Sequence, residues 1–216
     1  MTPVAIFYHT LFNGVHRPIN SAFVVHLMNE QMRTIESVGL VDYAKEMWVG
    51  VNGDDDDAAL AKALAPEKAR VVAHGAGTTT EITTLRLLRT WALSNPNWAV
   101  LYFHSKGCSH PENPNTEWRL NMEKHALHNW RMCVFSLDSG HEAVGCYWLT
   151  PEAHPGLVQK HPFYGGNMWW STSNYIARLP NLPEPTFENR YEAESWIGMG
   201  KPRPRIVNLI QGWPPQ

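Results

Sequence analysis

The sequence predicts one α/β domain with a mainly parallel sheet sandwiched by helices. Short apolar runs rich in strand-forming residues alternate with amphipathic segments of helical period over the first two thirds of the chain. Turn residues separate these segments. The composition, 44% hydrophobic and 18% charged, is that of a folded chain with a substantial core. We expect a single domain over residues 1–216, in which 199–216 form a proline-rich tail that packs along the surface.

The apolar runs mark the strands of the predicted sheet. We expect strands at 4–8, 46–51, 69–73, 98–103, 141–147 and 166–170. The run at 98–103 (WAVLYF) is apolar throughout, unlike a strand with one solvated face. It therefore predicts a central strand that is covered on both faces.

The amphipathic segments predict the helices that cover the sheet. These segments are 21–38, 58–64, 81–93, 116–136, 171–178 and 190–198. Ser21 and Thr116 are expected N-caps, and Gly39 is the expected C-cap of the first helix. Four adjacent aspartates, 54–57, precede the second helix. We interpret them as a solvated loop that caps this helix rather than as a metal site, because adjacent carboxylates point in different directions and repel one another.

Charge and cysteine content exclude several classes of protein. The formal net charge is −2, so no concentrated basic surface is expected for nucleic acid or anionic membranes. Cys108, Cys133 and Cys146 lack CxxC spacing, which argues against a disulfide framework or a zinc site and favours a reducing compartment. The first residues do not resemble a signal peptide, and no stretch approaches the roughly 20 apolar residues of a membrane span. We therefore expect a cytoplasmic protein.

Tryptophan is unusually frequent, with ten residues. A Trp-rich core explains most of them. The alternative is that some rings line a site for a sugar or a base, where a flat apolar face meets a flat ligand face.

Polar residues follow the expected strands directly. In open parallel sheets, ligands bind outside the carboxyl ends of the strands. His104, Ser105, Lys106 and Gly107 follow the expected central strand and provide an imidazole, a hydroxyl, an ammonium group and a permissive backbone. This combination suits a phosphate or pyrophosphate. The alternative is a polar turn without a ligand.

Two further segments are candidates for the site. Gly165 and Gly166 allow close approach of the backbone, and Asn167 can bind a hydroxyl or carbonyl; a tight bend before a core strand is the alternative. Glu192 and Glu194 lie about 200° apart on a helix, so only one can face a site. Glu194 lies closer to the expected buried side, where burial would raise its pKa and suit a general base. A salt bridge, for example to Arg190, is the alternative.

Familiar cofactor motifs do not occur in the chain. There is no GxGxxG, GxxxxGK[ST] or GxSxG, which leaves dinucleotide-binding, P-loop and α/β-hydrolase functions without support. The eleven histidines form no HxxxH or HxH pair, and no Asp-x-Asp stands at a strand end. No metal ligand is therefore predicted.

Three blocks resemble glycosyltransferases of the GT-A type, in particular a bacterial and viral group related to polysaccharide-synthesis enzymes. The blocks are LYFHSKG at 101–107, FYGGNMWW at 163–170 with its continuation to 180, and RYEAESWIG at 190–198. The VGVNG strand at 49–53 and the opening strand and helix are also similar to that group. Together these segments cover most of the chain, and their order and spacing carry the resemblance.

The resemblance implies a nucleotide-sugar donor at the carboxyl edge of the sheet and a carbohydrate or glycoconjugate acceptor beside it. The expected donor-binding residues are Tyr8, His9, Thr10, Asn52, His104, Ser105, Lys106 and Gly107. The expected residues on the acceptor and sugar side are Gly165, Gly166, Asn167, Trp169 and Trp170, with Glu194 or Glu192 as the base. Neither nucleic acid nor a membrane span is expected as a partner.

One departure from the GT-A pattern concerns the metal. Enzymes of this type commonly carry Asp-x-Asp where His104 and Lys106 stand here, and hold a divalent cation with it. Lys106 could neutralise the diphosphate as a fixed cation. Transfer without a metal is therefore compatible with the sequence, and a requirement for Mn²⁺ or Mg²⁺ stays open.

We thus expect a hexosyl- or related transferase, with inverting chemistry favoured because it needs only one base. The alternative is a non-catalytic module that binds a glycan or nucleotide on the same fold. A nucleotidyl- or phosphotransferase is a third interpretation, but it requires a carboxylate metal site that the sequence does not provide.

Overall fold

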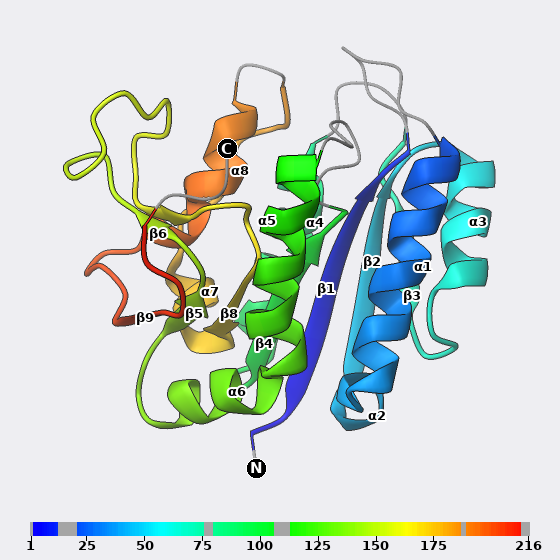
Figure 1. The fold of residues 1–216 in the computed structure, drawn as a ribbon, viewed down its shortest axis with the longest axis horizontal. Helices are drawn as coiled ribbons and strands as arrows, with labels where there is room; N and C mark the ends of the chain where they lie inside the picture. The colour runs from blue at the N-terminus through cyan, green and yellow to red at the C-terminus, as the bar shows by residue number, and fades with distance from the viewer. Residues whose placement is uncertain (1, 13–20, 76–79, 106–112, 187–188, 213–216) are drawn as a thin grey trace.

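The apolar runs assemble into one seven-stranded sheet, seen in a computed structural model that describes residues 2–12, 21–75, 80–105, 113–186 and 189–212 (Figure 1). The sheet order is β3-β2-β1-β4-β8-β5-β9. Its strands are β1 (Val4–Leu11), β2 (Glu46–Asn52), β3 (Arg70–Ala73), β4 (Ala99–His104), β5 (Ala143–Gly145), β8 (Trp169–Thr172) and β9 (Ile206–Asn208). A separate hairpin-like pair is formed by β6 (Trp148–Leu149) and β7 (Phe163–Tyr164).

The pairing is mainly parallel, as predicted. β1 pairs in parallel with both β2 and β4, and β2 pairs in parallel with β3. β8 runs antiparallel to its neighbours β4 and β5, whereas β9 is parallel to β5. The chain moves outward from β1 to β3 and then returns to form β4 on the other side of β1. The strand order therefore reverses between β1 and β4, which makes their carboxyl ends a topological switch point.

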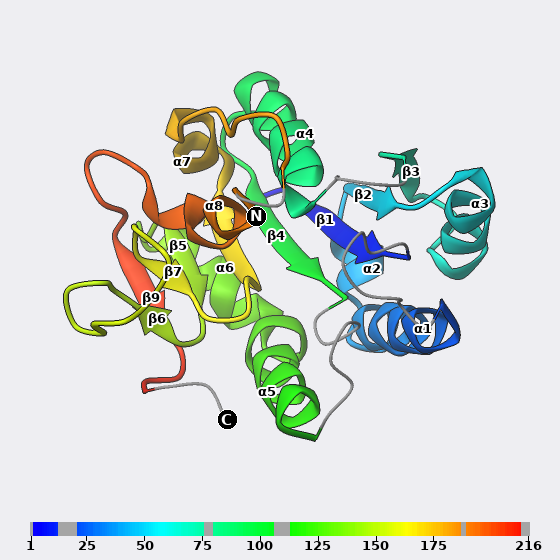
Figure 2. The same ribbon diagram turned by 90° about the horizontal axis from the view of Figure 1, so that it is seen from above.

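Helices cover both faces of the sheet (Figure 2). The helical elements are α1 (Ser21–Ser37), α2 (Leu40–Tyr43), α3 (Asp55–Leu64), α4 (Glu81–Ser94), α5 (Asn113–Glu123), the π-helix η1 (Lys124–His128), α6 (Trp130–Asp138), α7 (Ser173–Arg178), α8 (Arg190–Ser195) and the 3₁₀ helix η2 (Trp196–Gly198). One core layer packs α1, α5, η1 and α6 against the sheet, and the other packs α4, α7 and α8. The predicted α/β sandwich is confirmed.

The central strands contribute to both cores. On β4, Leu101 and Phe103 belong to the layer of α1 and α5, whereas Val100 and Tyr102 belong to the layer of α4. All four side chains are fully buried. Because successive side chains of a strand point to opposite faces, a strand covered on both sides must be apolar throughout. The prediction that 98–103 forms a covered central strand is confirmed.

Three elements differ from the sequence-based expectations. The helix after β4 begins at Asn113, so Thr116 lies within it and is not its N-cap. The tail does more than pack along the surface, because β9 extends the sheet by pairing with β5. The helix expected at 116–136 is divided by the π-helix η1 and a break at Asn129. In η1, the Ala126 carbonyl accepts the indole N–H of Trp170, and the His125 carbonyl accepts the thiol of Cys133. Side chains that take carbonyls from the helical ladder are a recognised cause of such interruptions.

The aspartate run caps α3, in agreement with its interpretation. Asp54 is the N-cap and accepts the backbone N–H of Asp57, whose carboxylate accepts the N–H of Asp54 in return. The helix begins at Asp55, so three of the carboxylates lie in its first turn rather than in a loop. In the described ranges, no helix is long and apolar enough to cross a membrane.

Candidate functional site

The carboxyl ends of β1 and β4 bring two histidines side by side at the switch point. His9 on β1 is in register with His104 on β4 and with Gly50 on β2. His9 is only 3% exposed. The backbone N–H of Ser105, itself buried, donates to the His9 carbonyl at 3.0 Å. The parallel register thus places two predicted donor-binding residues next to each other.

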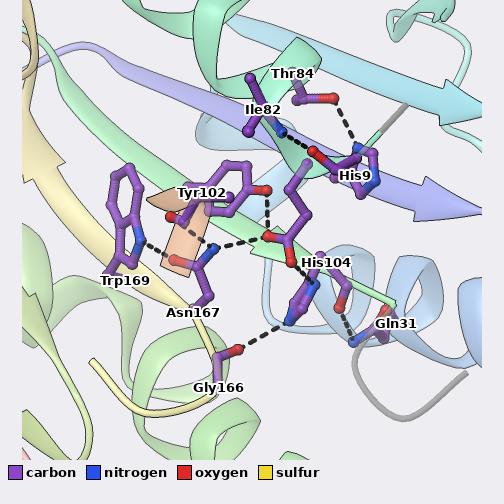
Figure 3. Close-up of polar contacts among 12 residues, drawn as sticks. His9, Gln31, Ile82, Thr84, Tyr102, His104, Gly166, Asn167 and Trp169 are labelled. Atoms are coloured by element: carbon purple, nitrogen blue, oxygen red, sulfur yellow. Dashed lines mark hydrogen bonds and ion pairs between the residues drawn. The ribbon is translucent and has the colours of Figure 1, made fainter. Parts of the chain in front are cut away.

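Glu81, in the first turn of α4, is the hub of this edge (Figure 3). Its Oε2 accepts the Tyr102 hydroxyl and the Asn167 side-chain amide, each at 2.7 Å. Its Oε1 lies 3.1 Å from Nδ1 of His104. Burial alone would raise the pKa of Glu81, but the charge and hydrogen bond of His104, with contributions from His9 and Tyr102, lower it to about 2. The carboxylate is therefore ionised at neutral pH.

His104 ties β4 to the turn that precedes β8. While Nδ1 faces the Glu81 carboxylate, Nε2 lies 2.9 Å from the carbonyl oxygen of Gly166. Both neighbours are hydrogen-bond acceptors, so the ring satisfies both only when each nitrogen carries a hydrogen. The HSKG and GGNMWW blocks, about 60 residues apart in the sequence, thus meet through His104 and Glu81.

A second histidine pair shares one threonine hydroxyl. Oγ1 of Thr84 on α4 lies 2.8 Å from Nδ1 of His9 (Figure 3). The same oxygen lies 3.1 Å from Nε2 of His74, which follows β3. Burial lowers the pKa of His9 to about 3 and that of His74 to about 4, although Glu81 acts in the opposite direction on His9. Both rings are therefore neutral at pH 7.

Asn52 and Thr10 carry buried polar atoms without partners among the described residues. Asn52, the last residue of β2, is 1% exposed, and neither its Oδ1 nor its Nδ2 makes a hydrogen bond. The Thr10 hydroxyl on β1 is also buried and unpaired. Strand alternation places Asn52 on the α4 side of the sheet with His9, and Thr10 on the α1 side. Each such unsatisfied group costs about 1–3 kcal/mol, so Asn52 is a strong candidate for ligand contact.

A charged network supports the other side of this edge. Gln31 on α1 accepts the Tyr8 hydroxyl and donates to Glu123 and to the His104 carbonyl. Nη1 of Arg119 donates to both carboxylate oxygens of Glu123, at 2.8 and 3.0 Å. Burial favours the neutral form of Glu123 and raises its pKa in spite of Arg119. Tyr8, a predicted donor-binding residue, is fully buried and belongs to this supporting network.

The predicted acceptor residues lie largely in the core. Asn167 has a positive φ of 51°, donates from Nδ2 to Glu81 and Ala193, and accepts the Trp169 indole at Oδ1. Trp169 and Trp170 are fully buried. A side chain on Gly166 would come within 2.6 Å of the Met122 sulfur, and φ there is 85°. This geometry is that of a tight bend before a core strand, and a role of these residues toward a sugar stays a prediction.

The predicted catalytic residues are distributed differently. Glu192 is exposed on α8, whereas Glu194 is half-buried and accepts the side-chain amide of Gln159. Lys106 and Gly107 lie outside the described residues.

Cys133 and Cys146 are free and buried, and burial raises the pKa of each thiol to about 12. Across the described ranges, no group of three or more His, Cys, Asp or Glu side chains could hold a metal ion.

Sequence reasoning missed Glu81 and Thr84, the two α4 residues at the centre of the site. A local signal existed. Glu81 opens a helix that follows the carboxyl end of a strand, and Thr84 lies three positions later on the same helical face. An acidic residue at a helix start is common for dipole reasons alone, however, so the pattern carried little weight.

A comparison with protein families assigns the chain to one of them. A family model described as "Domain of unknown function (DUF8361)" matches residues 7–205. The chain belongs to the DUF8361 family. The match spans every element of the site, from β1 to α8.

Curated proteins and solved structures add little to this family assignment. No curated protein matches the chain significantly. Rv0371c from Mycobacterium tuberculosis H37Rv, crystallised with manganese, is 14% identical with a TM-score of 0.47, over 99% of this chain and 91% of that one. A 4-diphosphocytidyl-2C-methyl-D-erythritol synthase is 14% identical with a TM-score of 0.44, over 96% of this chain and 88% of that one. At this level of similarity, nothing about the substrate, metal or reaction of those proteins is transferred to this chain.

Proposed function

We propose that this DUF8361 protein is a glycosyltransferase that binds a nucleotide-sugar donor at the carboxyl edge of β1, β2 and β4. The observation that carries the proposal is the buried side-chain amide of Asn52 beside the switch point, which has no hydrogen-bond partner in the part of the chain that the structure describes. An amide side chain offers one donor group and one acceptor, which complements the paired donor and acceptor on the edge of a nucleobase. A bound nucleotide would therefore relieve the cost of leaving Asn52 unsatisfied.

The remaining donor contacts follow from the strand ends. His9 lies on the same side of the sheet as Asn52, and His104 and Ser105, at the end of β4, immediately precede Lys106 in the sequence. Lys106 is proposed to face the diphosphate as a fixed cation, with Mn²⁺ or Mg²⁺ as the alternative source of positive charge. The acceptor sugar is proposed to enter from the side of Gly166 and α8, where Glu194 is half-buried.

Thermal shift with nucleotide sugars tests the proposal directly. The purified chain, the variant Asn52→Ala and the control Asn174→Ala are heated with UDP-, GDP-, CMP- and dTDP-sugars, with and without MnCl₂. Asn174 is a suitable control because it is exposed, lies on α7 away from the carboxyl ends of β1, β2 and β4, and its side chain bonds to Asn97. At a donor concentration 100 times Kd, binding stabilises the native state by about 2.7 kcal/mol, which raises Tm by several degrees.

We expect one class of nucleotide sugar to stabilise the parent chain and Asn174→Ala but not Asn52→Ala. Absence of a shift with every donor would contradict the proposal, and an equal shift in Asn52→Ala would remove its supporting observation. Turnover of the stabilising donor then separates an enzyme from a binding module. A donor that binds but is neither hydrolysed nor transferred to any sugar would favour the non-catalytic alternative.

A further inference from the structure

We propose that His9, Thr84 and His74 form a proton relay that removes a proton from a substrate hydroxyl at the end of β1. The inference rests on the proposed function, because it names the general base of the transfer. It differs from the sequence-based prediction, in which Glu194 takes that proton. The relay would carry the proton from the buried switch point toward His74, which is half-buried after β3.

The relay is defined by two hydrogen bonds to a single oxygen. Oγ1 of Thr84 is 2.8 Å from His9 Nδ1 and 3.1 Å from His74 Nε2, both within normal hydrogen-bond range. Thr84 is 0% exposed, so water does not compete for its hydroxyl. We place the substrate hydroxyl at the other nitrogen of His9, Nε2, at the opposite end of the relay from His74.

Thr84 has one hydrogen to donate, and this couples the tautomers of the two rings. If Thr84 donates to His74 Nε2, His9 must donate from Nδ1, and both rings carry their hydrogen on Nδ1. If Thr84 donates to His9 Nδ1, His74 must donate from Nε2, and both rings carry their hydrogen on Nε2. The two neutral histidines therefore always share the same tautomer.

The surroundings of His9 favour a relay over a simple base. Burial lowers the pKa of His9 to about 3, against the attraction of the Glu81 charge and with small contributions from His74 and His104. An imidazolium is therefore costly at this position. A proton can arrive at Nε2 only if another leaves from Nδ1, and Thr84 is positioned to accept it.

The proposed step balances in atoms and electrons. The acceptor oxygen forms a bond to the anomeric carbon, and the bond from that carbon to the phosphate oxygen breaks, its electron pair leaving on the nucleoside diphosphate. The hydroxyl proton passes to His9 Nε2, the Nδ1 proton of His9 to Thr84, and the Thr84 proton to His74 Nε2. His74 releases its Nδ1 proton to water. The reverse shift, with loss of the Nε2 proton of His9 to water and uptake of one at His74 Nδ1, restores the starting state.

Gly50 provides the space that the relay requires. A Cβ atom at this position would overlap Thr84 Oγ1 and lie 2.7 Å from His74 Nε2. Gly50 is opposite His9 in the register of β1 and β2. Any larger residue would push the hydroxyl or the ring out of line, so the glycine is needed for the side chains it faces rather than for its own backbone.

Nitrogen NMR of the substrate-free protein tests the coupling without any assumption about activity. Protein labelled with ¹⁵N in histidine is measured at pH 7, with His9→Gln and His74→Gln for assignment. We expect both rings to be neutral and to carry the hydrogen on the same type of nitrogen, in the parent chain and in Thr84→Ser. Opposite tautomers, or an imidazolium at either ring, would overturn the relay.

Kinetics with the donor identified by thermal shift test the catalytic part. Thr84→Val keeps the shape of the side chain but removes the hydroxyl, and should lower kcat by about 100-fold or more while KM for the donor is unchanged. Thr84→Ser should stay within about 10-fold of the parent, because it restores the hydroxyl. Thr90→Val is the matched control, since Thr90 is exposed on the same helix and bonds only to the Arg86 carbonyl.

The outcomes separate the relay from the proposed function. If the parent chain turns over a donor and Thr84→Val does so equally fast, the relay is wrong and the transferase assignment stands. A large loss of kcat in Glu194→Gln, with no loss in Thr84→Val, would indicate that Glu194 on α8 is the base. If no donor binds or reacts, the proposed function fails, and the NMR measurement still decides whether the tautomers are coupled.

Discussion

A single carboxylate connects the HSKG and GGNMWW blocks of the sequence. Glu81 receives hydrogen bonds from Tyr102 and Asn167 and faces His104. These three groups come from the middle of β4, the turn before β8 and the end of β4. Hydrogen bonds to an ionised acceptor are about twice as strong as neutral ones, so Glu81 should dominate the local stability.

Replacing Glu81 by glutamine should therefore lower the stability of the folded protein. The amide of Glu81→Gln has the same shape but only one acceptor oxygen, so at least one of the three donors would face an N–H group. We expect the free energy of unfolding in urea to fall by about 3 kcal/mol. Glu67→Gln, an exposed position before β3, should change it by less than about 0.5 kcal/mol. Equal effects of the two variants would show that Glu81 is not a structural hub.

The residue scale also shows which site residues could be predicted. His9, Asn52 and His104 were predicted because each stands at the end of an apolar run, and the structure brings these strand ends to one edge of the sheet. Their role toward a ligand stays a prediction. Glu81 and Thr84 could not be ranked, because a helix start explains an acidic residue without any site. Their roles depend on where α4 packs, which no local pattern encodes.

At the scale of elements, α3 shows that a run of like charges can be a helix signal. Asp54 and Asp57 form a reciprocal capping box, and the carboxylates of the first turn suit the positive end of the helix dipole. A metal would not be required to hold these residues together. The position of each aspartate relative to the cap should decide its energetic contribution.

Removing the cap should destabilise the protein more than removing a neighbouring charge. Asp54→Ala loses the side-chain bond to the Asp57 N–H and should lower the free energy of unfolding by about 1 kcal/mol. Asp56→Ala removes a carboxylate in the same turn that makes no capping bond and should cost about 0.5 kcal/mol or less. Chemical denaturation of both variants decides the matter, and a larger loss for Asp56→Ala would contradict the assignment of the cap.

The α5–η1–α6 segment shows the limit of periodicity. Its apolar pattern predicted one long helix, and all of it is helical except near Asn129. The π-helix arises where Trp170 donates to the carbonyl of Ala126 and Cys133 donates to the carbonyl of His125. Trp170 lies on β8, more than 40 residues away, so the interruption is a tertiary effect.

At the scale of the molecule, the buried histidines should make stability depend on pH. Burial lowers the pKa of His9 to about 3 and of His74 to about 4, from a usual 6.5. The unfolded chain then takes up protons that the folded chain does not, so the stabilisation is complete above pH 6.5 and is lost as pH falls toward 4. For His9 the slope is about 1.4 kcal/mol per pH unit in this window.

Urea unfolding at pH 7.5, 6.5, 5.5 and 5.0 measures this slope. His9→Gln should flatten it, whereas His128→Gln, an exposed position on η1, should leave it unchanged. Glu81, with its pKa lowered to about 2 from 4.5, adds a separate loss only below pH 4.5. Stability that is constant between pH 7.5 and 5.0 would contradict the neutral, buried state of the histidines.

The sequence alone determined the α/β class, the central place of β4 and the edge at which the candidate site lies. These follow from local hydrophobic period and from the position of polar residues after strands, both of which a single segment carries. Tertiary structure alone decided that Asn52 is buried without a partner among the described residues, that β9 joins the sheet, and that Glu81 and Thr84 stand among the histidines. Those contacts join residues up to 86 positions apart, and they depend on strand register and helix placement, which are properties of the packed molecule.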